Sequence, residues 1–267
     1  MTRIGQMFEC RKREGRKALL AYLTAGDPTP DRTPALVEAL VRGGADLIEL
    51  GVPFSDPVAD GPVIQQAGER ALKAGTTLAR VLEIARRIRE RCDVPLLLFT
   101  YLNPVMRYGL DRLAADAAAA GIDGCLLTDA SVEEARDYVA AMHRHGLDTV
   151  FLAAPTSTEH RLRLVAEYST GFVYLVSRTG VTGERSSLSD QAAPLIRAAR
   201  AVTDLPLAVG FGISRPEHVA QLSAEVDAVV VGSAIVRLIE QHGGDPALEA
   251  ELESFVRSLK SGFGANA

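Results

Sequence analysis

The chain contains no tryptophan, three cysteines and four lysines among its 267 residues. The cysteines, Cys10, Cys92 and Cys125, are too widely spaced for a zinc signature or a disulfide framework. The formal net charge of −5 gives no basic field that would attract nucleic acid or an anionic membrane surface. A long apolar run is also missing at the N-terminus, so we expect no signal peptide, no membrane span and a cytoplasmic location.

The scarcity of lysine narrows the possible chemistry. A Schiff-base aldolase needs a lysine at the catalytic end of a strand. Lys17 enters the first apolar run at the opposite end, and the other three lysines lie in helical stretches. His143 and His145 are two residues apart on a predicted helix and diverge, so we expect no metal pair there. Lyase chemistry in this chain would therefore be acid–base chemistry carried out by carboxylates.

Short apolar runs alternate with amphipathic helical patterns along the whole chain. Eight runs are typical of buried strands, at residues 18–24, 47–51, 95–101, 124–129, 149–153, 172–176, 205–209 and 227–231. A row of buried strands joined by helices predicts a parallel sheet. Eight such units without a linker predict a single (β/α)8 TIM barrel domain over residues 1–267, with extra helices at the N-terminus and in the loops. A doubly wound sheet is the alternative, but the even strand spacing leaves no obvious reversal point.

Local signals mark several helix ends. Gly43 and Gly44 predict the end of the helix that follows the first strand. The segment Ser131-Val-Glu-Glu134 has the spacing of a capping box, which predicts the start of another helix.

Two acids, Glu49 and Asp60, lie on the second predicted strand and in the loop that follows it. In a barrel of this kind, the active site lies at the carboxyl ends of the strands. Glu49 points to the same side as Leu47 and Gly51, among apolar groups that raise a carboxyl pKa and so suit it to proton transfer. The alternative for Glu49 is a structural carboxylate paired with arginine. Asp60 lies in the proline-stiffened loop that follows, where spacing alone does not separate a catalytic acid from an ordinary turn aspartate.

Glycine-bearing loops follow the last three predicted strands, at residues 179–183, 210–214 and 232–233. Glycine lets the backbone approach a ligand closely, and free amides at a helix N-terminus bind an anion. The loops after strands seven and eight form the common phosphate site of this fold. Tight turns alone are the other explanation, but three adjacent loops favour a phosphate site at Gly183, Gly212, Gly232 and Ser233.

Six segments together resemble the tryptophan synthase alpha chain family over essentially the whole chain. They are Tyr22-Leu-Thr-Ala-Gly-Asp-Pro28, Glu49-Leu-Gly-Val-Pro-Phe-Ser-Asp-Pro-Val-Ala-Asp-Gly-Pro62, Thr100-Tyr-Leu-Asn-Pro104, Gly180-Val-Thr-Gly183, Gly210-Phe-Gly-Ile-Ser214 and Gly232-Ser-Ala234. The resemblance implies a lyase that cleaves indole-3-glycerol phosphate to indole and D-glyceraldehyde 3-phosphate. It also implies that this chain uses no cofactor of its own.

The resemblance further implies roles for single residues. Glu49 would protonate indole C3 and later take the proton from the side-chain hydroxyl of the substrate. Asp60 would accept the indole N–H and stabilise the positive charge on the ring, with Thr182 closing over the site. The residues implied to bind the substrate are Tyr22, Leu126, Tyr174, Thr182 and Phe211.

A partner is implied in the same way. The family assembles with a β chain that uses pyridoxal phosphate to join indole to serine, so we expect an α2β2 tetramer. The residues expected to face that β chain are Pro53, Asp56, Pro57, Asn103 and Pro104. One departure is visible after Asp129, where the family often has an apolar residue and then proline but this chain has Ala130 and Ser131.

Two other interpretations stay open at this stage. The chain could be another phosphate-binding barrel enzyme of aromatic or histidine biosynthesis, or a non-catalytic barrel that activates a partner. The presence of both Glu49 and Asp60 favours a catalyst. Release of indole from indole-3-glycerol phosphate by the pure chain would separate these possibilities.

Overall fold

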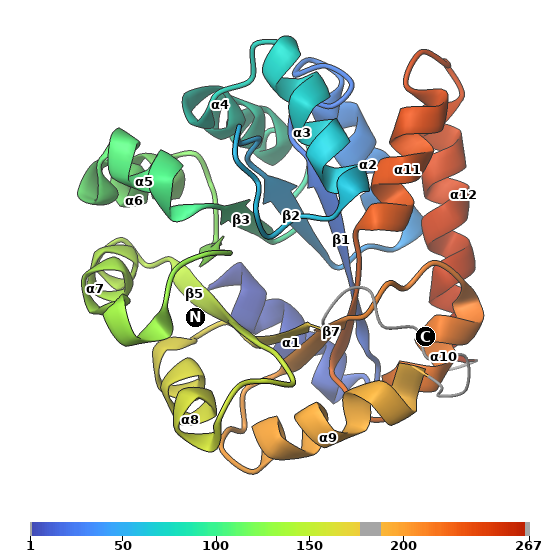
Figure 1. Ribbon diagram of the computed structural model, residues 1–267. Coiled ribbons are helices and arrows are strands. Elements are labelled where there is room, and N and C mark those ends of the chain that lie inside the picture. The colour runs from blue at the N-terminus through green and yellow to red at the C-terminus, as the bar shows by residue number, and fades with distance from the viewer. Residues whose placement is uncertain (1, 177–187, 265–267) are drawn as a thin grey trace.

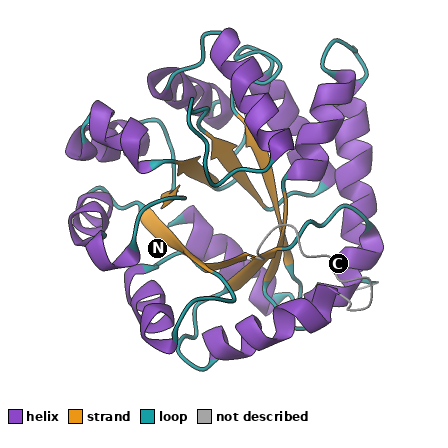
Figure 2. Cartoon of the chain, viewed as in Figure 1, coloured by secondary structure: helices purple, strands orange, loops and turns teal. Residues whose placement is uncertain are grey.

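Eight parallel strands close into a barrel in the computed structural model, which describes residues 2–176 and 188–264. The strands follow the chain order around the barrel, and helices surround them (Figures 1 and 2). They are β1 (Ala18–Thr24), β2 (Leu47–Gly51), β3 (Leu96–Thr100), β4 (Gly124–Leu127), β5 (Asp148–Ala153), β6 (Val173–Val176), β7 (Leu207–Gly210) and β8 (Ala228–Val231). The predicted barrel is therefore confirmed, with every strand at its predicted place along the chain.

The helices include one before the barrel and several additional ones in the loops, as predicted. They are α1 (Arg3–Arg13), α2 (Thr33–Gly43), α3 (Pro62–Lys73), α4 (Leu78–Arg89), α5 (Leu102–Tyr108), α6 (Leu110–Ala119), α7 (Arg136–Arg144), α8 (Glu159–Tyr168), α9 (Leu188–Arg200), α10 (Pro216–Ser223), α11 (Ser233–His242) and α12 (Leu248–Lys260), with 3-10 turns η1 (Val132–Glu134) and η2 (Ser261–Phe263). Because Ile4 and Phe8 of α1 pack among the inward-facing strand residues, this helix covers the amino-terminal end of the barrel.

Side-chain alternation along the strands creates two separate apolar layers. Inward-facing residues such as Leu20, Leu47 and Leu97 fill the barrel interior. Their outward-facing neighbours, such as Leu19 and Ile48, pack against the surrounding helices. The strands are buried on both faces, which is why their sequences are almost continuously apolar.

One of the two predicted helix-end signals is confirmed and the other is wrong. Helix α2 ends at Gly43, and Gly44 has a φ of 109°, a left-handed conformation that favours glycine. At residues 131–134 the chain forms the 3-10 turn η1 instead of a capping box, and α7 starts only at Arg136. The Ser131 hydroxyl donates a hydrogen bond to the Glu133 carboxylate, so it does not cap a backbone N–H.

Candidate active site

Glu49 lies inside the barrel, near the carboxyl end of β2. The strand register places it between Tyr22 of β1 and Leu97 of β3, on the side of β2 that faces the interior. Its side chain is 0 % exposed, and neither carboxyl oxygen has a hydrogen-bond partner within the described residues. Burial raises the pKa of Glu49 from 4.5 to about 8, because no neighbour compensates the charge. At neutral pH the side chain is therefore mainly a protonated acid that can give up a proton.

Asp60 lies in the loop between β2 and α3, and Tyr101 holds this loop. The Tyr101 hydroxyl accepts a hydrogen bond of 3.1 Å from the Ala59 N–H and donates one to the Asp60 carboxylate. Burial raises the pKa of Asp60 to about 6, and the hydrogen bond from Tyr101 opposes this rise. Asp60 is therefore mainly ionised at neutral pH, so the two carboxyl groups have opposite protonation states.

Aromatic side chains lie beside these acids. The rings of Tyr22 and Phe99 meet edge to face at a centroid distance of 5.3 Å, and those of Phe99 and Tyr174 at 6.4 Å. The charge of Glu49 adds to burial in raising the pKa of both tyrosines. Leu126, which is fully buried, belongs to the same interior cluster as Tyr174. The structure thus places Tyr22 and Tyr174 next to Glu49, with Leu126 in the apolar cluster to which Tyr174 belongs.

Sequence reasoning did not single out Phe99, or the role of Tyr101 in holding Asp60. Phe99 could have been found from the alternation along β3, because Leu97 faces the interior and Phe99 is two residues further on. The contact of Tyr101 with the loop 59–60 had no local sequence signal, because the residues are about forty positions apart.

Of the other two predicted substrate-binding residues, one lies in a different layer and one lies outside the described residues. Phe211 is buried in the layer between strands and helices, because Ala208 faces inward and the alternation turns Phe211 outward. Thr182 lies outside the described residues, as does the predicted phosphate ligand Gly183.

Two of the predicted phosphate-binding glycines follow the carboxyl ends of β7 and β8, which pair with each other. Gly212 has a φ of 70°, and the space beside it is open, with no atom within 4 Å of where a Cβ would lie. Gly232 is the N-cap of α11, and no side chain caps this end among the described residues. The first-turn amides from Ser233 onward are thus available to an anion, which the positive end of the helix also attracts.

The sequence model of the family described as "Tryptophan synthase alpha chain" matches residues 8–263. The chain belongs to this family. It is 81% identical over 267 residues to the tryptophan synthase alpha chain of Solibacter usitatus (strain Ellin6076), covering 100% of both chains. It is 51% identical over 264 residues to that of Geobacter sulfurreducens, covering 99% of this chain and 100% of the relative.

Solved structures of tryptophan synthase alpha subunits have the same fold. The subunit from Legionella pneumophila superposes with a TM-score of 0.90 at 37% identity, covering 98% of each chain. A chain from the a2b2 complex of Pyrococcus furiosus gives 0.85 at 41% identity, covering 91% of this chain and 97% of that chain. The family, the lyase class and the barrel fold predicted from the sequence are confirmed, while the roles of single residues stay predictions.

The residues expected to face a β chain differ in exposure. Asp56 and Asn103 are exposed, Pro57 and Pro104 are half-buried, and Pro53 is buried within the chain. The same two segments also expose large apolar side chains that the sequence did not single out, Val58 at 84% exposure and Met106 at 63%.

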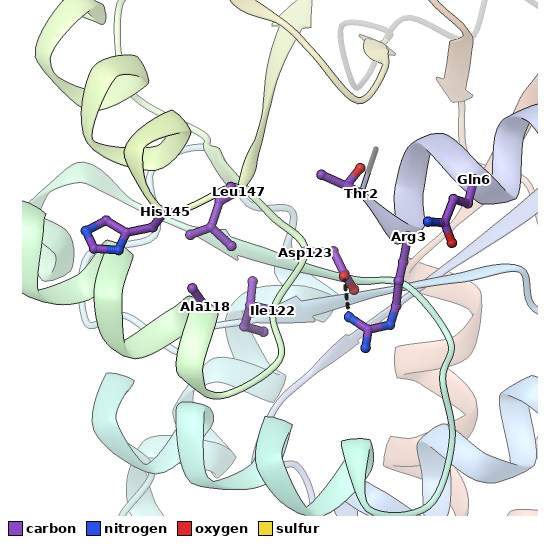
Figure 3. A pocket seen from close by; sticks show the side chains of 9 residues that line it. Thr2, Arg3, Gln6, Ala118, Ile122, Asp123, His145 and Leu147 are labelled. Carbon is purple, nitrogen blue, oxygen red and sulfur yellow. Dashed lines mark hydrogen bonds and ion pairs between the residues drawn. The ribbon is translucent and has the colours of Figure 1, made fainter.

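A hollow of about 410 Å³ lies at the opposite, amino-terminal end of the barrel, between α1 and the segments that enter β4 and β5 (Figure 3). Its one buried acid, Asp123, accepts hydrogen bonds from Arg3 at 3.1 Å, Arg89 at 3.0 Å and the Leu96 N–H at 2.9 Å. These bonds use the Asp123 charge to fasten α1 and α4 to the barrel, so Asp123 has a structural role here.

The four lysines and Cys125 are placed away from the site. Lys12, Lys73 and Lys260 lie in α1, α3 and α12, and Lys17 precedes β1. Cys125 faces the outer layer, where burial raises its pKa to about 12. Within residues 2–176 and 188–264, no cluster of three or more His, Cys, Asp or Glu side chains is placed to hold a metal ion. The helices of this part are also too short or too polar to cross a membrane.

Proposed function

We propose that this chain cleaves indole-3-glycerol phosphate to indole and D-glyceraldehyde 3-phosphate, with Glu49 and Asp60 as the acid–base pair. One observation carries the proposal: two carboxyl groups near the same interior aromatic residue have pKa values of about 8 and about 6. Their environments give them different protonation states at neutral pH. Glu49 can therefore give a proton while ionised Asp60 stabilises a positive charge. Family membership names the reaction that this pair would serve.

The reaction begins with proton transfer from Glu49 to C3 of the indole ring, which places a positive charge on the ring nitrogen. The Asp60 carboxylate accepts the ring N–H and stabilises this charge. Glu49, now ionised, takes the proton of the hydroxyl on the adjacent side-chain carbon. The carbonyl of glyceraldehyde phosphate forms, the bond to C3 breaks, and its electron pair restores the indole ring. Glu49 ends protonated, so protons and electrons balance without a cofactor in this chain.

The two ends of the substrate would contact different parts of the barrel mouth. Tyr22, Leu126 and Tyr174 would bind the apolar ring, with Phe99 beside them. Backbone amides at Gly212, Gly232 and Ser233 would bind the phosphate, together with Gly183, without a formal cation. Thr182 and Phe211 stay proposed substrate contacts on the strength of the family motif alone.

We also propose that the chain is the α subunit of an α2β2 assembly in the cytoplasm, with pyridoxal phosphate bound by the β chain. The tryptophan synthase a2b2 complex of Pyrococcus furiosus supports this kind of partner. The face formed by Asp56, Pro57, Asn103 and Pro104 would meet that chain, and exposed Val58 and Met106 add apolar area to it. Pro53 would support the loop from beneath. Residues 1–267 would act as one domain, because β1 pairs with β8 and closes the barrel.

The direct test is indole release by the purified chain from indole-3-glycerol phosphate. The wild type and Glu69→Gln should release indole, since Glu69 lies exposed on α3. Glu49→Gln should not do so at a comparable rate. A wild-type chain that releases no indole, alone or with its β chain, would overturn the proposal.

A further inference from the structure

Arg70 joins three segments that lie far apart in the sequence. Its Nε and Nη2 donate to the two carboxylate oxygens of Asp27 at 2.8 and 2.9 Å, and its Nη1 donates to Glu240 at 2.9 Å. Asp27 follows β1 and is 1 % exposed, whereas Glu240 lies on α11. The two-pronged contact fixes the guanidinium plane, so this link is more rigid than a single ion pair.

The helices that Arg70 joins begin at the two ends of the proposed site. Helix α3 starts at Pro62, two residues after Asp60, and α11 starts at Ser233 in the proposed phosphate site. At about 1.5 Å per residue, Arg70 lies about 12 Å along α3 and Glu240 about 10 Å along α11. The two helices contact each other and lie side by side in Figure 1. The ion pair therefore joins them at a similar depth.

An apolar contact connects the same helices closer to the site. Ala67 of α3 and Val236 of α11 form a buried cluster with Tyr22 of β1. Ala67 lies one turn before Arg70, and Val236 lies one turn before Glu240. Packing near the site and ionic bonds one turn further along thus hold the two helices in one relative position.

We infer that Arg70 is a positioning residue that sets the distance between the acid–base end of the site and its phosphate end. The inference rests on the proposed function, in which one substrate reaches from Asp60 to the amides of Gly232 and Ser233. A ligand that spans both ends benefits when the ends are held in place before it binds. A ligand that occupies one end alone does not need their separation to be fixed.

The test compares ligands that span the site with ligands that do not. In Arg70→Lys, the positive charge stays but the two-pronged bond to Asp27 is lost. Calorimetry should show that indole propanol phosphate binds about 10- to 100-fold more weakly than it binds the wild type. Indole and glycerol 3-phosphate, each measured alone, should bind within about twofold of the wild type. The kcat/KM for cleavage should fall with the affinity for the spanning ligand, and its pH profile should keep its shape.

Arg32→Lys is the matched control. Arg32 makes a similar two-pronged contact with Glu249 of α12, with both bonds at 2.9 Å. It also donates to the backbone oxygens of Gly243 and Asp245, just beyond α11. These bonds do not join α11 to α3, so their loss leaves the link between the two ends of the proposed site in place. This variant should lose a similar amount of thermal stability and bind all three ligands normally. Glu240→Gln is a second variant, which keeps the Asp27 contact and weakens the bond between α3 and α11. It should show a smaller loss in the same direction.

Two results would show that Arg70 only stabilises the fold. The first is an equal loss of affinity for all three ligands. The second is an unchanged affinity for the spanning ligand in both Arg70→Lys and Glu240→Gln. Failure of the wild type to release indole would instead refute the proposed function. The two failures are therefore distinguishable.

Discussion

Replacing Glu49 by Gln removes a carboxyl group whose ionisation the barrel interior opposes. The carboxyl has no hydrogen-bond partner among the described residues, and burial raises its pKa from 4.5 to about 8. The amide keeps the side-chain volume but has no proton to transfer at neutral pH. If Glu49 is the general acid, Glu49→Gln should release indole about 100- to 10,000-fold more slowly than the wild type.

The same substitution should change how stability depends on pH. Below pH 4.5 the Glu49 carboxyl is protonated in both the folded and the unfolded chain, so its titration does not change the free energy of unfolding. Between pH 4.5 and about 8 the unfolded chain loses this proton while the folded protein keeps it, and the free energy of unfolding falls. Above pH 8 the loss is constant. At about 1.4 kcal/mol per pKa unit, it amounts to about 5 kcal/mol, a large part of the stability of a typical domain.

Urea unfolding of both proteins at pH 5, 7 and 9 measures this effect. Other titrating groups, such as Asp60 and Asp148, are present in both proteins, so the difference between them isolates Glu49. Relative to the wild type, Glu49→Gln should gain about 4 kcal/mol between pH 5 and pH 9. A difference that stays constant over this range would refute the view that an uncompensated buried carboxyl lies at this position.

The remaining predictions concern the other parts of the site. The rate of indole release should rise as pH increases through about 6 and fall above about 8, because Asp60 acts in its ionised form and Glu49 in its protonated form. Asp60→Asn should abolish the rise. An unchanged pH profile in this variant would contradict the role of Asp60. Gly212→Val should weaken glycerol 3-phosphate binding, whereas Gly15→Val, with a similar φ of 68° and open surroundings at the other end of the barrel, should not. Equal effects of the two substitutions would indicate general strain. Addition of the β chain should raise indole release about 5- to 150-fold, and less so in Asp56→Ala; a full response of that variant would exclude coupling through this loop.

The sequence determined the parts of this protein that depend on local periodicity. Apolar runs alternating with helical patterns predicted every strand of the barrel, because a strand buried on both faces must be apolar throughout. The alternation of side chains along a strand also placed Glu49 on the inward side with Leu47. The scarcity of lysine gave an independent reason to expect carboxylate chemistry. The family motifs then named the reaction.

The tertiary structure decided which residues distant in the sequence contact one another and how these contacts change their environments. Spacing left Asp60 undecided between a turn residue and an acid, and its environment became visible only with the hydroxyl of Tyr101 beside it. Phe211 belongs to the family motif, yet its position after inward-facing Gly210 turns it into the outer layer. Arg70 has no local signal at all, because its partners precede and follow it by many residues. Local patterns fix the side to which a residue points, but closing the barrel from β1 to β8 determines which side chains meet there and how strongly burial changes their charge.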